Sequence, residues 1–425
     1  MINSRRIYTT LLWLLLPYVF FHLAWRARKQ PEYLKHVGER FGFYPGKSNK
    51  PVIWLHTVSV GETRAAASLV QRLQAAYPDH QLLLTHTTPT GRAASEQLYG
   101  DKVLRVYLPY DYPFAVKRFL RHFQPRVGIL LETEIWFNLI HFCHDARLPL
   151  LLLNARLSEK SAARYASYPN LVRLGLGELS GVAAQTEADA ARLTELGAAN
   201  VSVMGNLKYD IEAPSTMLEL GLNLRCNMGI NRPVFLAAST REGEEILLLE
   251  ALKQLDIPRL LIVIVPRHPQ RFDEVAGLCA RYQLHVQRRS EDQPVAPETQ
   301  VLLGDSMGEM FAYYMACDIA YIGGSLLPFG GQNLIEACSV GKPVLIGPHT
   351  YNFAEASRLA VERGAALRVA SADEVALQLR ELFSQHERMT RMGRAGMDFV
   401  RANRGATERA LALISNTLIT STSMH

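Results

Sequence analysis

Short apolar segments rich in Val, Ile and Leu alternate with amphipathic stretches along most of the chain. In the first half, this pattern predicts strands within residues 51–59, 81–88, 103–110, 126–134, 148–158, 181–187 and 201–210. Stretches between them, such as residues 63–77 and 113–122, have the apolar spacing of helices. Strands that alternate with helices predict a parallel sheet covered by helices on both faces.

The alternation stops over about residues 211–232 and then resumes. A second set of strands is predicted within residues 233–240, 259–268, 285–290, 301–306, 319–325, 343–349 and 365–371. We therefore predict an α/β fold with two doubly wound, Rossmann-like domains at residues 31–212 and 233–425, joined by a linker at residues 213–232. An alternative, in which the last helix packs back on the N-terminal domain, stays open. Because ligands of open α/β sheets bind at the carboxyl ends of the strands, the active site is expected in a central cleft between the domains.

Residues 7–25 contain no Asp, Glu, Lys or Arg, and basic residues flank this segment on both sides. We predict that residues 1–30 form a helical membrane anchor, because a helix of about 20 apolar residues spans the hydrocarbon core. A helix lying in the membrane interface is an alternative, as is a buried core helix. A signal peptide is less favoured, since no small-x-small cleavage site follows. The basic cluster at residues 26–29 favours the cytoplasmic side for the body of the protein.

Composition narrows the classes of function. The net charge of +6 favours an anionic surface or substrate. No helix-turn-helix or aromatic-plus-basic repeat is present, so no nucleic acid partner is predicted. The five cysteines lack CxxC spacing, and the histidines fall singly on different predicted strands. We therefore predict neither a bound metal nor another cofactor.

Polar residues gather at the ends of the predicted strands, where the fold would place a site. In the N-terminal domain, Glu62 is predicted to be a general base that removes a proton from an acceptor hydroxyl. Its alternative role is that of a partner for a helix dipole. Glu132 or Glu134 is expected to orient the acceptor or hold Glu62, although a polar strand end is the alternative, more so for Glu134. The acceptor-side candidates are Ser59, Gly61, Thr88 and Thr90.

The C-terminal domain carries a glycine-rich segment at residues 322–348. Its backbone N–H groups and the start of a helix near Gln332 and Asn333 predict a phosphate site, and Glu336 is placed to accept hydrogen bonds from a ribose. The spacing fits neither GxGxxG nor GxxxxGK[ST], which favours a nucleotide-sugar donor. The donor-site candidates are Ser239, Thr240, Arg267, His268, Gly323, Gly324, Gly330, Gly331, Asn333 and Glu336. Glu244 and Glu245 are interpreted as dipole partners, and His268 as either a ligand or a cap.

Nine motifs in order along the chain resemble the 3-deoxy-D-manno-octulosonic acid (Kdo) transferases of lipopolysaccharide assembly. They are GERFGFY at 38–44, HTVSVGET at 56–63, TPTG at 88–91, YLPYD at 107–111, ETEIW at 132–136, NARLS at 154–158, GNLKYD at 205–210, VPRHPQRF at 266–272 and GGSLLPFGGQNLIEA at 323–337. The resemblance implies the GT-B glycosyltransferase fold.

The resemblance also implies an activity, namely inverting transfer of Kdo from CMP-Kdo to the lipid A precursor lipid IVA, with release of CMP. Glu62 is then the base and Glu132 supports the site. Arg267, Asn333 and Glu336 hold CMP, and Lys208 contacts an anionic part of a substrate. The acceptor implies a location at the cytoplasmic leaflet of the bacterial inner membrane.

Three residues depart from the family's usual motifs. Gln332 replaces the histidine of GGHN, and Arg241 replaces the histidine of STHEGEE. Phe137 stands where a proline often follows the tryptophan of ETEIW. Gln332 cannot carry a proton, and Arg241 adds a permanent charge near the donor residues. The rival functions are another lipid-directed glycosyltransferase, a nucleotide-sugar epimerase, and a membrane-tethered nucleotide-binding regulator.

Overall fold

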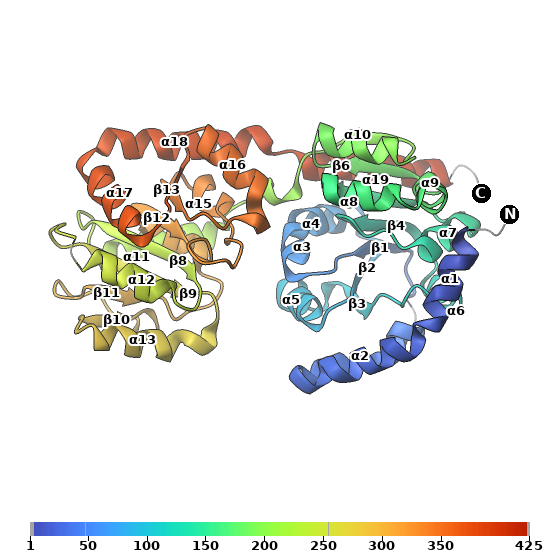
Figure 1. The fold of residues 1–425 in the computed structure, drawn as a ribbon, viewed down its shortest axis with the longest axis horizontal. Helices are drawn as coiled ribbons and strands as arrows, with labels where there is room; N and C mark the ends of the chain where they lie inside the picture. Colours follow the sequence, from blue (N-terminus) through green and yellow to red (C-terminus); the bar gives the residue numbers. More distant parts are fainter. Residues whose placement is uncertain (1–3, 47, 254, 423–425) are drawn as a thin grey trace. The chain divides into compact units, whose positions relative to one another are not determined.

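The computed structural model describes residues 4–46, 48–253 and 255–422 (Figure 1). The chain forms two compact units. Unit 1 comprises Met1–Asp210 and Arg404–His425, and unit 2 comprises Ile211–Asn403.

Unit 1 is built on a sheet of seven parallel strands in the order β3-β2-β1-β4-β5-β6-β7. The strands are β1 (Val52–His56), β2 (Gln81–His86), β3 (Leu104–Tyr107), β4 (Pro125–Leu131), β5 (Leu150–Ala155), β6 (Gly181–Ala184) and β7 (Val201–Val203). Every strand predicted for the first half is confirmed. The order reverses beside β1, the first strand, which is the topological switch point of such a sheet.

Helices cover both faces of this sheet. Trp54 of β1 packs in one apolar core, whereas its neighbours Ile53 and Leu55 pack in the other. Both faces of the strand are therefore buried, which explains why its sequence is apolar throughout. The helices of unit 1 are α3 (Val60–Ala65), α4 (Ala67–Ala76), α5 (Pro89–Tyr99), α6 (Pro113–Phe123), α7 (Phe137–Asp145), α8 (Glu159–Ala166), α9 (Pro169–Gly177), α10 (Glu187–Glu195) and α19 (Ala406–Thr422).

Unit 2 repeats this architecture with strands in the order β10-β11-β9-β8-β12-β13-β14, all parallel. The strands are β8 (Val234–Thr240), β9 (Leu261–Pro266), β10 (Val286–Arg288), β11 (Val301–Leu303), β12 (Ile319–Ile322), β13 (Val344–Ile346) and β14 (Ala366–Arg368). All seven strands predicted for the second half are also confirmed. The helices are α11 (Ser215–Met228), α12 (Glu244–Leu252), α13 (Phe272–Arg281), α14 (Met310–Ala316), α15 (Ile335–Ser339), α16 (Ala354–Glu362), α17 (Ala372–Ser384) and α18 (His386–Asn403).

The segment between the units differs from the predicted linker. Most of residues 213–232 form helix α11, which packs on α14 of unit 2. Gly221 allows the close approach, since a Cβ there would lie 2.4 Å from Met315 Cβ. The chain after α18 returns to unit 1, where α19 packs on α4, as the open alternative held. Asp210 binds the start of α19 by accepting hydrogen bonds from the N–H groups of Gly405 (2.7 Å) and Thr407.

The N-terminal segment forms two helices rather than one. Helix α1 (Ser4–Leu14) and helix α2 (Leu16–Lys29) meet at a bend of 50°. Pro17 lies in the first turn of α2, where a missing N–H and the proline ring interrupt a continuous helix. Within the described residues neither helix alone has the length and apolarity of a membrane span, whereas the bent pair together meets both criteria.

Polar contacts hold α1 on unit 1. The Tyr8 hydroxyl donates to Asp111 Oδ2 at 2.8 Å, and Thr9 Oγ1 donates to Asn138 Oδ1 at 2.9 Å. Asp111 also accepts from the N–H groups of Asn138 and Leu139 at the start of α7. Helix α1 is thus part of the folded unit, and α2 packs on the 3₁₀ helix η1 (Pro31–Leu34) of the same unit (Figure 1).

Candidate active site

Glu62 lies in the first turn of α3, directly after β1. Ser59 is the N-cap of this helix, and its Oγ accepts from Glu62 N–H at 3.3 Å and donates to Glu62 Oε1 at 2.8 Å. Val58 N–H donates to Glu62 Oε2 at 2.7 Å. Serine at the N-cap and glutamate three residues later form a reciprocal cap, which satisfies backbone N–H groups at the helix start. The cap fixes the direction of the Glu62 carboxylate.

The same cap occurs at the start of α17, where Glu374 N–H donates to Ser371 Oγ at 3.3 Å. Ala370 N–H donates to Glu374 Oε2 at 2.7 Å. Both glutamates are half-buried, but the hydrogen bonds of the second cap are exposed and those of Glu62 are partly buried. Capping alone therefore does not distinguish Glu62, but its surroundings do.

The surroundings of Glu62 favour its protonated form. Burial raises the pKa of the Glu62 carboxyl, and the nearby charge of Glu132 raises it further. Hydrogen bonds from Val58 and Ser59 and the charge of Lys208 act in the opposite direction. Lys208 Nζ lies 3.5 Å from Glu132 Oε1. The structure thus brings together Glu62, Glu132 and Lys208, three residues that the sequence placed at separate strand ends.

Glu134 joins this group, although the sequence favoured Glu132 over it. Its Oε2 accepts a hydrogen bond from Trp136 Nε1 at 2.8 Å and lies 3.9 Å from Nε2 of the buried His56. Burial, together with the charges of Glu62 and Glu132, raises the pKa of Glu134 to about 7. Burial also lowers the pKa of His56 to about 3, so this imidazole is neutral. A partly protonated carboxyl therefore lies beside Glu62 at neutral pH.

Backbone strain marks the carboxyl ends of three strands. Glu132, Asn154 and Ser239 have positive φ angles of 61°, 54° and 56°. Such angles are costly for residues other than glycine and collect at functional sites. Asn154 Oδ1 accepts from Leu207 N–H at 3.0 Å, which fixes the short 3₁₀ helix η4 (Leu207–Tyr209) that carries Lys208.

The acceptor-side candidates differ in their surroundings. Thr88 caps α5 and donates to Val58 O at 2.9 Å, so its hydroxyl supports the turn that precedes Glu62. Gly61 and Thr90 are exposed. Gly91 allows α5 to approach this turn, because a Cβ there would lie 3.0 Å from Val58 O. Ser59 and Thr88 therefore position Glu62, and Gly61 and Thr90 remain open to a ligand.

In unit 2, the Glu244 carboxylate binds N–H groups of the glycine-rich loop that were predicted to bind a phosphate. This carboxylate is fully buried and accepts hydrogen bonds from the N–H groups of Gly324, Ser325 (3.0 Å) and Leu326 (3.1 Å). It also accepts from the Tyr321 hydroxyl at 2.6 Å. The interpretation of Glu244 as a simple dipole partner was wrong, because its main partners lie on the loop after β12. These three N–H groups are consequently not available to bind a nucleotide-sugar donor.

The second half of the glycine-rich segment is also occupied by internal contacts. The N–H groups of Gly331 and Gln332 donate to the carbonyl oxygens of Gly324 (2.7 Å) and Gly323 (3.0 Å). Gly323 N–H donates to Ala238 O, and Gly330 packs against Tyr351. Helix α15 begins only at Ile335 and is five residues long, so the helix starts later than the sequence predicted. The phosphate site at this position stays a prediction.

Asn333 and Glu336 contact each other at the start of α15. Asn333 Oδ1 accepts from Ile335 N–H at 3.0 Å, and its Nδ2 donates to Glu336 Oε1 at 3.0 Å. Both side chains are half-buried, and the carboxylate is held in a fixed direction. This geometry is compatible with the predicted contact to a ribose.

The structure also contradicts the predicted role of Thr240 in the donor site. Its side chain is fully buried, and its hydroxyl donates to Glu245 Oε1 at 2.6 Å, so it is not accessible to a donor. Glu245 is also bound by Arg271, with Nη1 at 2.7 Å and Nη2 at 3.1 Å. Ser239 Oγ points to Met310 Sδ at 3.8 Å. The contacts of Thr240 at the end of β8 therefore stabilise the fold of unit 2.

The side chains that directly follow β8 and β9 of unit 2 are mainly basic. Arg267 Nε donates to Gln332 Oε1 at 3.2 Å. Arg241 places its guanidinium carbon 4.4 Å from the centre of the Phe329 ring. Burial lowers the pKa of His268, and the charges of Arg241 and Arg267 lower it further. An anionic ligand is therefore favoured here by side chains rather than by backbone N–H groups.

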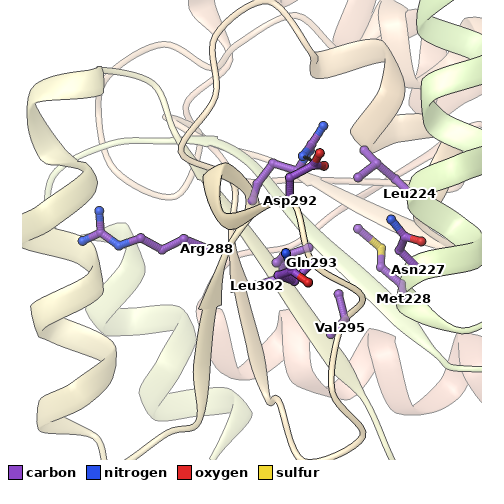
Figure 2. A pocket seen from close by; sticks show the side chains of 9 residues that line it. Leu224, Asn227, Met228, Arg288, Asp292, Gln293, Val295 and Leu302 are labelled. Atoms are coloured by element: carbon purple, nitrogen blue, oxygen red, sulfur yellow. Dashed lines mark hydrogen bonds and ion pairs between the residues drawn. The ribbon is translucent and has the colours of Figure 1, made fainter.

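A separate small pocket lies elsewhere in unit 2, between α11 and the segment around β10 (Figure 2). Leu224, Met228, Val295 and Leu302 form its apolar part, and Arg288 and Asp292 lie beside it. None of the donor-site candidates lines it. Among the described residues, no three His, Cys, Asp or Glu side chains are grouped as metal ligands would be.

Comparison with known proteins identifies the family. A family profile described as "3-Deoxy-D-manno-octulosonic-acid transferase (kdotransferase)" matches residues 35–211. The 3-deoxy-D-manno-octulosonic acid transferase of Bordetella pertussis is 41% identical, over 98% of this chain and 100% of its own length. The chain belongs to the Kdo transferase family. The resemblance inferred from the motifs is thereby confirmed.

Solved structures support the fold of this Kdo transferase family member. A glycosyltransferase from Rickettsia africae ESF-5 superimposes with a TM-score of 0.58 at 15% identity, covering 87% of this chain and 99% of that one. A UDP-GlcNAc 2-epimerase from Neisseria meningitidis gives 0.57 at 18% identity, covering 87% and 100%. The predicted GT-B architecture is confirmed. Because a transferase and an epimerase share it, the fold alone does not choose between these reactions.

Proposed function

We propose that this protein transfers Kdo from CMP-Kdo to the lipid A precursor lipid IVA, with inversion at the anomeric carbon and release of CMP. Membership in the Kdo transferase family supports the sugar and the reaction class. The observation that carries the mechanism is the half-buried Glu62 carboxylate, directed by its cap and surrounded by Glu132, Glu134 and Lys208. Burial and neighbouring charge give such a carboxylate the basicity that a general base requires.

In the proposed step, the acceptor hydroxyl donates its proton to Glu62 while its oxygen attacks the anomeric carbon of Kdo from the face opposite CMP. The bond between this carbon and the phosphate oxygen breaks, and its electron pair leaves with CMP. Lys208 contacts an anionic part of a substrate beside Glu62, and Glu132 supports the site through its ion pair with Lys208. Arg267 neutralises the charge that develops on the phosphate. These residues supply positioning, one base and two cations, so we propose that the reaction needs no metal or cofactor.

We further propose that the N-terminal helices bind the cytoplasmic leaflet of the bacterial inner membrane, where the lipid acceptor lies. Large apolar side chains of α1 and α2 are exposed, including Leu14, Tyr18, Phe21 and Trp25. Apolar side chains and adjacent arginines at residues 5–6 and 26–28 match the interface of an anionic leaflet. An enzyme bound there would reach its acceptor by diffusion in the plane of the membrane.

Transfer from labelled CMP-Kdo to lipid IVA in detergent or mixed vesicles tests the reaction. We expect labelled Kdo in the lipid product and one CMP released for each Kdo transferred. Donor turnover without incorporation into lipid would favour an epimerase or a hydrolase. Tight CMP binding without any turnover would favour a nucleotide-binding regulator.

A further inference from the structure

The donor-binding edge of unit 2 has few free backbone donors and an excess of positive side chains. Glu244 occupies the N–H groups of Gly324, Ser325 and Leu326. Carbonyl oxygens occupy those of Gly331 and Gln332. These five N–H groups do not bind a nucleotide phosphate or a sugar carboxylate, so side-chain cations are favoured for that contact.

Arg241 is placed for that role. It follows β8 directly, and its guanidinium lies against the face of Phe329. Its Nε is buried and makes no hydrogen bond, which is costly for a cationic donor. The nearest carboxylate, Glu242, lies 3.7 Å from Arg241 Nη2 and is largely exposed, so water weakens this ion pair.

Arg241 and Gln332 flank the same glycine. A Cβ on Gly324 would lie 3.3 Å from Arg241 Cγ and 3.4 Å from Gln332 Nε2. Gln332 also accepts from Arg267 Nε, which fixes the direction of the second guanidinium. The Gly324 loop thus lies between one arginine and the glutamine that orients the other. Because glutamine carries no charge, the positive charge beside the Gly324 loop comes from Arg241 and Arg267.

We propose that Arg241 binds an anionic oxygen group of the donor, alongside Arg267, and thereby contributes to donor specificity. This inference rests on the proposed function, since it takes a CMP-sugar as the ligand. A guanidinium offers two parallel N–H groups to a phosphate or a carboxylate. Stacking on Phe329 restricts the side chain before the ligand arrives, which lowers the entropy lost on binding.

Calorimetric titration with CMP and with cytidine tests this assignment in the full-length protein. We expect Arg241→Ala to weaken CMP binding by about tenfold to a hundredfold, which is the loss of one charge-assisted contact. Cytidine has no phosphate, so its binding should not change. Arg241→Lys should restore only part of the CMP affinity, because an ammonium lacks the planar pair of donors.

Arg281→Ala is the matched control, because it removes an exposed arginine from the end of α13 in the same unit. It should leave CMP binding unchanged, and both alanine variants should keep the melting temperature of the parent protein within a few degrees. If the alanine at position 241 leaves CMP affinity unchanged but raises the KM for CMP-Kdo about tenfold, Arg241 binds the sugar carboxylate. If neither quantity changes, the assignment is wrong.

The proposed function fails in a different way. A parent protein that binds no CMP would refute the donor itself. A parent protein that binds CMP as tightly as the Arg241→Ala variant, with an unchanged KM for CMP-Kdo, would refute only the role of Arg241.

Discussion

The first helix after the first strand carries an acid in both units, yet the two acids have different surroundings. Glu62 of unit 1 is held by its own turn, through Val58 and Ser59, and remains half-buried beside Glu132, Glu134 and Lys208. Glu244 of unit 2 is fully buried and holds a loop 80 residues further along the chain.

The comparison teaches that position in the fold does not decide the role of a carboxylate. Glu244 has all its strong partners within the protein, so it contributes to the structure of the Gly324 loop. Glu62 keeps one side toward charged neighbours and solvent, and its pKa is raised. A group must be accessible and basic to exchange a proton with a substrate. Unit 1 is thus suited to proton transfer, and unit 2 to holding an anion by cations.

The largest effect is expected from Glu62→Gln, which should slow the transfer of Kdo. Losing a general base lowers kcat by about 10²-fold to 10⁴-fold, whereas CMP affinity in unit 2 should stay the same. Initial rates with labelled CMP-Kdo and calorimetry with CMP measure both quantities. The control is Glu374→Gln, which alters a cap with the corresponding backbone N–H contacts at α17 and should preserve kcat. Equal loss of kcat in the two variants would mean that capping, not base catalysis, explains Glu62.

For Glu244→Gln, the main expected effect is on the stability of the protein. An amide has one acceptor oxygen and cannot satisfy the N–H groups of the loop that the carboxylate binds, so stability should fall by about 2–4 kcal/mol. Denaturant unfolding measures this change, with Glu62→Gln expected to cost about 1 kcal/mol or less. A fully stable Glu244 variant would contradict the proposed contrast between the two acids.

A smaller effect is expected on the pH dependence of transfer. Since the base form of Glu62 is lost as the pH falls through a raised pKa, kcat/KM should decline on the acidic side at a higher pH than for an exposed carboxylate. Lys208 lowers this pKa, so Lys208→Met should move the acidic limb to higher pH. A limb that moves downward, or does not move, would show that Lys208 is not coupled to Glu62.

The smallest effect concerns the strained strand end of unit 2. Ser239→Gly relieves a positive φ of 56° at the cost of more freedom in the unfolded chain, so we expect a stabilisation of about 1 kcal/mol or less. Thermal unfolding is the measurement, and CMP binding is the companion test. A destabilised variant would indicate that the contact from Ser239 to Met310 outweighs the backbone strain.

Part of the site could be predicted from the sequence, and part could not. The pattern Ser59-x-x-Glu62 is also a capping signature, which the predicted roles of Glu62 as a general base or a dipole partner did not include. Gly61 and Thr90 are exposed, and Asn333 pairs with Glu336, but their contacts with ligands stay predictions. The partners of Glu244 and Thr240 were not predictable, because they depend on how β8, β12 and α12 pack. No local pattern indicates that a glycine-rich loop will donate to a buried glutamate.

The sequence by itself determined the two parallel sheets, the family and the charge of the candidate residues. Apolar runs bounded by turns specify strands locally, and side-chain chemistry is the same in any fold. Only the tertiary structure decided which of these groups remain accessible. Packing of distant strand ends gave the Gly324 N–H and the Thr240 hydroxyl partners within the protein. It left Glu62 half-buried beside other charged groups and Arg241 Nε without a hydrogen bond. Accessibility depends on contacts between segments far apart in the chain, which no single stretch of sequence encodes.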